Sequence, residues 1–351
     1  MKISIITIHG IPNFGSVFQS YALCNYLQKN GYTDVELIDY NPTYFNKKTV
    51  RSTVGRLLNL SSVLRRKKKF RSFIEKNIPV TEKSFVSVEE LKAANIEADV
   101  YIAGGDQLWN IYHDCGNDEA YKLTFAKGKK ISYATSMGQK DFSQYELLKL
   151  ADLIKDFSAI SVRESSSVEL LKIVDIKAEQ CVDPVYLLEK VDYEKFIKPV
   201  NQPEYLLVYL VTPSKLLDEC IEYLSEKYNL KVILCSGLSK KCTCDEFLKD
   251  LGPDEVLSYI VNAKIVLSSS FHATSFSLIF QKQFFTILPD EHTNERIEDL
   301  LNQIELSHRI ITPNSNLETA LSNVVDYDSV KSYSAYIEKS KQYLRRVLAD
   351  D

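Results

Sequence analysis

The sequence lacks the features that mark several classes of protein. Its 351 residues carry a net charge of only −4, so no strong overall field favours nucleic acid as a partner. No run approaches the roughly 18 consecutive apolar residues that predict a membrane span. The opening apolar run, Ile3–Ile8, is interrupted by Ser4 and Thr7, whereas a secretory signal has about 7–15 apolar residues before its cleavage site. We therefore expect a cytoplasmic protein.

The cysteine pattern predicts neither a disulfide framework nor a metal site. The seven cysteines are odd in number and scattered along the chain, which indicates free thiols in a reducing compartment. Cys242 and Cys244 are closer together than in the usual zinc knuckle, and no second pair follows them. We expect no metal and no cofactor.

What the sequence does contain is a regular alternation of strands and helices. An opening strand, an amphipathic helix over 16–29 and a second strand over 35–39 form a βαβ unit, which implies a parallel sheet. Later segments repeat the alternation, and the chain length favours two domains. We expect an α/β protein of two Rossmann-like doubly wound domains, residues 1–190 and 191–328, followed by a long amphipathic helix within 329–351.

Ligands of such sheets bind outside the carboxyl ends of the strands, so the polar residues that follow each strand are the candidates for function. The first junction, His9–Ser16, leads into the predicted helix. Gly15 allows close approach of the backbone, and the helix N-terminus offers free N–H groups. Asn13 and Gln19 can hydrogen-bond to hydroxyls. The alternative is a capped turn with Ser16 as the N-cap.

The second junction follows the predicted strand over 100–103. Gly105, Asp106 and Gln107 lie directly after this strand. Trp109 is the only tryptophan in the chain, and aromatic faces stack on sugars. The alternative is that Trp109 fills the core and Asn110 caps a helix.

The third junction presents Arg163 between a strand and a helix. Its planar guanidinium can hold a carboxylate through two hydrogen bonds. The alternative is an ordinary ion pair with Glu164 or another acidic residue.

The fourth junction joins an apolar strand over 264–268 to a helix that is expected from about residue 274. Ser269, Ser270 and Thr274 supply hydroxyl groups beside a helix N-terminus, which suits an oxyanion or a phosphate. His272 can donate a proton or carry positive charge near neutral pH. The alternative is a histidine with a structural role.

Two further regions carry cations. Asn294 and Arg296 begin a helix that follows a strand, so they are candidates for the same site. Arg309 comes later along the chain, and the alternative for both arginines is a surface position.

The segment 47–71 mixes ten basic residues with leucine and valine. Each basic residue near an anionic leaflet contributes about 1 kcal/mol, so this segment is a candidate for a peripheral membrane contact. The alternative is a solvated helical face.

The order of these junctions resembles the polysaccharide pyruvyltransferase family from Ile3 to about Arg309. Seven short segments carry the resemblance. They are Asn13–Gln19, Gly104–Asn110, Ser161–Glu164, Val182–Pro184, Gly252–Glu255, Ser269–Ser277 and Asn294–Arg296.

The resemblance implies a glycosyltransferase-B-like fold whose first domain binds the acceptor and whose second domain binds the donor. It implies a closing helix that crosses back to the first domain. It further implies transfer of a pyruvyl group from phosphoenolpyruvate onto a sugar, usually as a cyclic ketal, in capsular or exopolysaccharide precursors that are often lipid-linked. Segment 47–71 would then contact the inner face of the membrane.

The family's site residues map onto this chain with two departures. His272 matches the family's histidine, for which we expect a phosphate contact or an acid role, and Arg163 matches an arginine expected to hold the donor. Ser270 stands where several members have arginine, and Ala273 stands where glycine is frequent. Arg296 or Arg309 is the candidate replacement for the missing cation. The alternatives are a nucleotide-sugar glycosyltransferase of the same fold and a non-catalytic binder of an anionic metabolite.

Overall fold

The computed structural model describes residues 1–46, 59–209, 212–235, 237, 240–288, 295–330 and 332–349. The chain divides into two compact units. The first unit comprises Met1–Lys47, Arg71–Leu188 and Tyr333–Asp351, and the second comprises Lys48–Phe70 and Glu189–Ser332. The closing segment therefore groups with the first unit. The basic segment, which we expected in the first domain, groups with the second unit up to Phe70.

The first unit is built on a five-stranded parallel sheet with the order β3-β2-β1-β4-β5. Two short parallel strands, β6 and β7, lie next to it, and backbone bridges from Ile131 to Ala159 and from Thr135 to Val162 join β6 to β5. The strands are β1 Lys2–Ile6, β2 Asp34–Tyr40, β3 Val80–Phe85, β4 Val100–Gly104, β5 Lys129–Tyr133, β6 Ser161–Val162 and β7 Glu179–Gln180.

The second unit is built on a six-stranded parallel sheet with the order β10-β9-β8-β11-β12-β13. Its strands are β8 Tyr205–Tyr209, β9 Lys231–Cys235, β10 Glu246–Leu248, β11 Ile265–Ser268, β12 Gln283–Ile287 and β13 Ile310–Ile311. In both sheets the first strand of the unit is central and is almost wholly buried. The prediction of an α/β fold with parallel sheets is confirmed.

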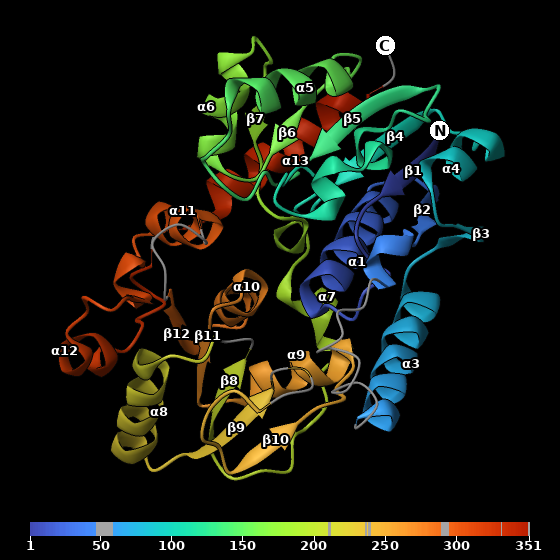
Figure 1. Ribbon diagram of the computed structural model, residues 1–351. Helices are drawn as coiled ribbons and strands as arrows, with labels where there is room; N and C mark the ends of the chain where they lie inside the picture. The colour runs from blue at the N-terminus through green and yellow to red at the C-terminus, as the bar shows by residue number, and fades with distance from the viewer. Residues whose placement is uncertain are drawn as a thin grey trace. The chain divides into compact units, whose positions relative to one another are not determined.

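Helices connect the strands of each sheet (Figure 1). Those of the first unit are α1 Phe14–Lys29, α4 Val88–Ala94, α5 Gln144–Ile154, α6 Ser165–Ile173 and α13 Ser334–Leu348, with short 3-10 helices at Thr43–Asn46, Asp114–Asn117, Glu119–Lys122 and Pro184–Tyr186. Those of the second unit are α7 Lys190–Glu194, α8 Lys215–Tyr228, α9 Pro253–Asn262, α10 Phe271–Ile279, α11 Glu295–Gln303 and α12 Leu317–Ser322, with a 3-10 helix at Ser307–Arg309. Helix α3, Leu60–Asn77, contains the boundary at Phe70.

The start of two helices differs from the sequence prediction because of capping. Helix α1 begins at Phe14, since the Asn13 side chain accepts hydrogen bonds from the N–H groups of Gly15 and Ser16. Ser16 is therefore inside the helix and is not its N-cap. Helix α10 begins at Phe271, three residues before the predicted start, because the Ser270 hydroxyl accepts from the N–H of Ala273. Ser, Asn and Asp are the residues that satisfy such unpaired N–H groups best.

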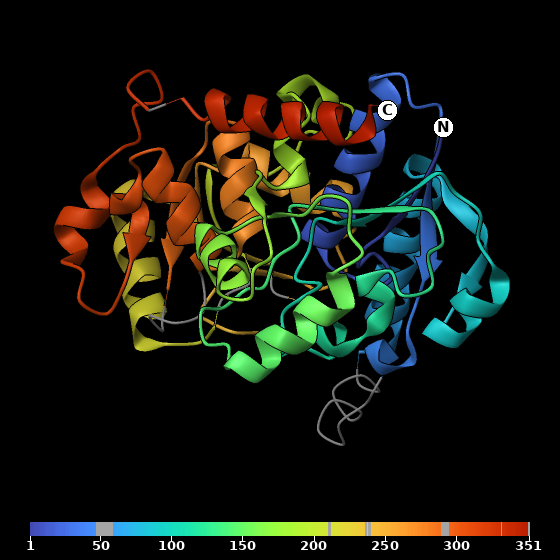
Figure 2. The same cartoon turned by 90° about the horizontal axis from the view of Figure 1, so that it is seen from above.

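The closing helix α13 is an unbroken helix that leads to the C-terminus (Figure 2). Within the first unit, its Tyr343 hydroxyl donates to the carbonyl of Ser132 on β5, at 2.9 Å. Its Ser340 hydroxyl accepts from the N–H of Val182, at 2.9 Å. These contacts fix α13 to the β5–β7 side of the first unit. Among the described residues, no helix combines the length and apolarity required to cross a bilayer.

Candidate functional site

The first unit brings together four of the predicted site residues, and with them Ser16, at the carboxyl ends of its strands. We call these five residues the first-unit cluster: Ser16, Gln19, Gly105, Asp106 and Arg163. The Ser16 hydroxyl donates to Asp106 Oδ2 at 2.7 Å, and the N–H of Gln107 donates to Asp106 Oδ1 at 2.7 Å. The first turn of α1 is therefore tied to the loop that follows β4.

Glycine is required at position 105. Its φ of +65° lies in the left-handed region, and a Cβ atom there would lie 2.2 Å from Gln19 Oε1 and 2.6 Å from Pro184 Cγ. Gln19 is fully buried. Its amide nitrogen donates to Thr7 Oγ1 and to the carbonyl of Ser16, each at 2.9 Å. Gln19 therefore packs beneath Gly105, and its side chain has no exposed surface that a ligand could contact.

Arg163 is buried, and its side chain forms an ion pair with an acidic residue of the same unit. Its guanidinium lies 2.6 Å from Asp183 Oδ2, with both side chains at most 3% exposed. It also donates to the carbonyl of Gly105. This corrects the expectation that Arg163 grips the donor, because the guanidinium is already engaged in a buried ion pair. Arg163 is a positioning residue that fixes the backbone of Gly105.

Trp109 is also corrected. The indole is fully buried in the apolar core of the first unit. Its N–H donates to the carbonyl of Tyr121 at 3.1 Å, and its ring packs edge-on against Phe157 with centroids 6.0 Å apart. A face that is packed in the core cannot stack on a sugar, so the core-filling alternative describes Trp109.

The other predicted residues of this unit lie around the cluster. Asn13 is exposed, and its amide oxygen caps α1. Gly15 is buried in the first turn of α1. Gln107 is partly exposed and accepts from the amide of Asn110 at 2.6 Å.

Sequence reasoning missed a second polar group at the same sheet end. His9 Nε2 lies 3.0 Å from Asp39 Oδ1, and His9 Nδ1 lies 3.0 Å from the carbonyl of Thr7. Arg71 contacts the other carboxylate oxygen at 3.2 Å. Burial raises the pKa of Asp39, but the hydrogen bond and charge of His9, together with Arg71, bring it down to about 2. The position of His9 just after the first strand was the available signal.

The second unit forms the α10 junction, residues 268–274, at the carboxyl end of β11. The Ser268 hydroxyl donates to the carbonyl of Tyr209 at 2.6 Å and accepts from the N–H of Ser270 at 2.9 Å. Ser269 and Ser270 are partly exposed. Helix α10 begins three residues after the end of β11, and the positive end of its dipole favours an anion.

His272 and Arg296 belong to the same neighbourhood. His272 lies in the first turn of α10, and its ring packs edge-on against Phe271 with centroids 5.3 Å apart. The Arg296 guanidinium carbon, from α11, lies 5.8 Å from the Phe271 ring centroid. The fold therefore places a cation from a different helix beside the residue that adjoins His272. Asn294, predicted with Arg296, lies outside the described residues.

Two residues of the second unit have structural roles instead of the predicted ones. Thr274 is buried, and its hydroxyl bonds to that of Thr286 on β12 at 2.9 Å. Arg309 is fully buried over the Phe285 ring at 3.9 Å, and it donates to the carbonyls of Phe284 and Asn323. Burial lowers the pKa of Arg309 to about 10. Arg309 is therefore not exposed to a ligand, whereas Arg296 is partly exposed.

The basic segment is described only from residue 59 onward, and residues 47–58 lie outside the described residues. In α3, Arg65 pairs with Asp250 at 2.5 Å and Lys69 pairs with Glu255 at 2.7 Å, both within the second unit. Leu60 and Leu64 are about half exposed, at 50% and 56%. Two of the basic side chains of α3 are thus paired with acidic residues of the protein, and two half-exposed leucines precede Lys67 and Lys68.

In the described part of the chain, no three His, Cys, Asp or Glu side chains form a metal-binding group.

Comparison with solved structures identifies the fold. UDP-GlcNAc 2-epimerase from Methanocaldococcus jannaschii is 15% identical, with a TM-score of 0.62 over 99% of this chain and 100% of that one. The enzyme from Rickettsia bellii is 13% identical, with a TM-score of 0.59 over 99% and 95%. The Neisseria meningitidis enzyme bound to UDP-GlcNAc is 12% identical, with a TM-score of 0.55 over 100% of both chains. The fold is that of GT-B enzymes.

Comparison with protein families identifies the relationship. No curated protein matches this chain in sequence. The family model of the polysaccharide pyruvyl transferases matches residues 13–291. The match spans both units and includes the first-unit cluster and the α10 junction. The chain belongs to the polysaccharide pyruvyl transferase family.

Proposed function

We propose that this protein transfers a pyruvyl group from phosphoenolpyruvate to a sugar of a capsular or exopolysaccharide precursor and forms a cyclic ketal. The observation that carries the proposal is the α10 junction. It combines a helix N-terminus, a histidine in its first turn and, through Phe271, the guanidinium of Arg296. Family membership supports the same class of reaction.

The donor presents the groups that this junction suits. Phosphoenolpyruvate carries a phosphate and a carboxylate. The N–H groups of the first turn of α10 favour one anion, and Arg296 supplies a cation for the other. Ser270 stands where several family members carry arginine. In this chain Arg296, on α11, supplies the positive charge instead.

The reaction needs one proton at carbon and the loss of one phosphate. His272 protonates the methylene carbon, which makes the neighbouring carbon electrophilic. A sugar hydroxyl adds to that carbon and loses its proton. The bond from the carbon to the phosphate oxygen then breaks, and phosphate leaves. A second sugar hydroxyl adds to the same carbon and loses its proton, which closes the ketal.

The first unit supplies the acceptor side of the proposal. Asn13 and Gln107 are the exposed or partly exposed polar residues next to the first-unit cluster. Amide groups of this kind pair well with sugar hydroxyls. Arg163, which is fixed by its ion pair with Asp183, donates a hydrogen bond to the carbonyl of Gly105 and so holds the neighbouring backbone in place.

A lipid-linked acceptor would bring the protein to the cytoplasmic face of a membrane. The half-exposed Leu60 and Leu64, followed by Lys67 and Lys68, give α3 an apolar and basic edge for this contact. Sedimentation with vesicles tests it. Binding to vesicles that contain anionic lipid, reduced in Leu60→Ser/Leu64→Ser, is the expected result. Equal sedimentation of both proteins would refute the contact.

Release of inorganic phosphate tests the proposed reaction. Purified protein, phosphoenolpyruvate and sugars that bear free 4- and 6-hydroxyls should release phosphate only when the acceptor is present. A panel of such acceptors without any release would contradict the proposal. Acceptor-dependent release of the nucleotide from a nucleotide sugar would instead identify a glycosyltransferase of the same fold, and tight binding without turnover would identify an anion-binding protein.

A further inference from the structure

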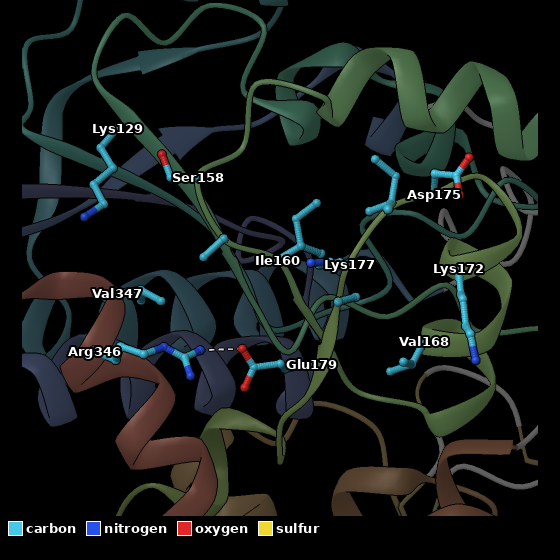
Figure 3. Close-up of a pocket in the computed structure, with 13 residues that line it drawn as sticks. Lys129, Ser158, Ile160, Val168, Lys172, Asp175, Lys177, Glu179, Arg346 and Val347 are labelled. Carbon is cyan, nitrogen blue, oxygen red and sulfur yellow. Dashed lines mark hydrogen bonds and ion pairs between the residues drawn. The ribbon is translucent and has the colours of Figure 1, made fainter.

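A pocket of about 1030 Å³ lies in the first unit at the end of the strands opposite the cluster. It is lined by Lys129, the first residue of β5, by the chain that leads into β6 at Ala159, and by the segment from α6 to β7. Arg346 and Val347 of α13 complete it (Figure 3). Catalytic ligands of parallel sheets bind at the carboxyl ends, so this pocket belongs to a different site.

The lining combines an apolar wall with an excess of cations. Ile160, Ile176 and Val347 contribute apolar surface. Four basic residues face two acidic ones, Asp175 and Glu179. Small-molecule sites typically have volumes of about 300–1,000 Å³, with apolar walls and a few polar groups. The volume and chemistry of this pocket correspond to such a site.

The cations are distributed along the pocket. Figure 3 shows Lys129, Arg346 and Val347 at one end, Lys172 and Asp175 at the other, and Ile160 between them. At the first end, the single acidic residue is Glu179, which pairs with Arg346. The two side chains of this pair are 61% and 39% exposed. Exposed ion pairs contribute only about 0–1 kcal/mol, so an anionic ligand can compete for the guanidinium.

We propose that this pocket binds a small organic phosphate that carries an apolar group. The phosphate lies between Lys129 and Arg346, where the guanidinium offers two parallel hydrogen bonds. The apolar group lies along Ile160 and Val347. Two sources share this chemistry, a prenyl phosphate and a nucleoside monophosphate, and the experiment below distinguishes them.

The pocket is linked to the loop of the first-unit cluster through one intervening side chain, Phe157. Ser158 lines the pocket, and the ring of its neighbour Phe157 packs against Trp109. Trp109 lies three residues after Asp106 on the loop that follows β4. An occupant can therefore act on this loop through two packed rings. Because Trp109 is the only tryptophan in the chain, a change in its fluorescence on ligand binding would test this link.

Ligand titration of the full chain tests the proposal. Geranyl phosphate and adenosine monophosphate are the two probes, and inorganic phosphate is the probe without an apolar group. Calorimetry measures the dissociation constant, and Trp109 fluorescence reports the site. One of the two organic phosphates should bind at least tenfold more tightly than inorganic phosphate and should change the fluorescence. The probe that does so identifies the source.

Matched variants locate the binding. Lys129→Gln/Arg346→Gln should raise the dissociation constant at least tenfold, and Lys129→Gln alone should raise it less. Lys190→Gln/Lys282→Gln, at a pocket of the second unit, should leave it unchanged. The thermal midpoint of each variant shows that it is folded. Absence of binding by both organic phosphates, equal binding by Lys129→Gln/Arg346→Gln, or equal binding of inorganic phosphate would overturn the proposal.

Discussion

In the first unit, the charged residues that follow the strands are paired with other side chains of the same unit. Arg163 is buried against Asp183, Asp106 accepts from Ser16, and His9 contacts Asp39. In the second unit, the α10 junction presents two partly exposed serines, Ser269 and Ser270, at a helix N-terminus. Paired groups hold a backbone in place, whereas a helix N-terminus offers N–H groups to an anion. The difference supports the proposal that the second unit binds the donor.

The largest expected effect concerns His272. His272→Ala should lower kcat by about 10²–10⁴, the range for loss of a general acid, while the thermal midpoint stays within a few degrees. His308→Ala, which changes an exposed histidine outside the junction, should retain full activity. Steady-state kinetics with phosphoenolpyruvate measures both. Activity of His272→Ala within twofold of the unmodified protein would remove His272 from the mechanism.

Arg163 should affect folding more than any other residue of the first-unit cluster. Arg163→Ala leaves Asp183 buried without its cation, and breaking a buried pair costs about 3–5 kcal/mol. Arg346→Ala breaks the exposed pair with Glu179 and should cost about 0–1 kcal/mol. Chemical denaturation gives the free energy of unfolding of both. Equal losses would contradict the distinction between a buried and an exposed pair.

The pH dependence of stability tests the His9–Asp39 pair. The folded pKa of Asp39 is lowered to about 2 from the ordinary value of 3.8. A lowered carboxyl pKa stabilises the fold above the unfolded pKa and loses this effect as pH falls through the folded value. The contribution, about 2 kcal/mol, should therefore disappear between about pH 4 and pH 2. The difference in unfolding free energy between the unmodified protein and Asp39→Asn should shrink over that window; a constant difference would contradict the assignment.

Arg296 should have the smallest of the four effects. Arg296→Ala should raise the KM for phosphoenolpyruvate about tenfold, since one hydrogen bond to a charged group contributes about 1.5–3 kcal/mol. Arg296→Lys keeps the charge and should recover part of the loss. The thermal midpoint of both variants should stay the same because Arg296 is partly exposed. An unchanged KM in Arg296→Ala would show that another group holds the donor.

Much of the fold could be predicted from the sequence because it depends on local patterns. The alternation of apolar strands and amphipathic helices predicts parallel sheets, and the junctions lie at strand ends as expected. Strand β3 was not predicted, because it lies at the edge of the sheet and four of its six residues are polar or charged. Strands β7, β10 and β13 were missed too, since each has only two or three residues.

The roles of the site residues depend on partners far along the chain, which local patterns do not specify. Arg163 pairs with Asp183, twenty residues later. His9 contacts Asp39, thirty residues later, through the pairing of β1 with β2. Trp109 is buried in the core, where its ring packs against Phe157, a residue far along the chain. For Ser270, by contrast, the capping role arises within four residues, and its place at a strand-to-helix junction was the signal.

The most direct test of the central claim is to identify the product. Phosphoenolpyruvate labelled with carbon-13 at its methylene carbon is incubated with a sugar acceptor, and the product is followed by NMR. The labelled carbon should become a methyl group attached to a ketal carbon, in an amount equal to the phosphate released, and His272→Ala should not form it. Release of phosphate with labelled free pyruvate as the only product, or a ketal of equal yield in His272→Ala, would contradict the account.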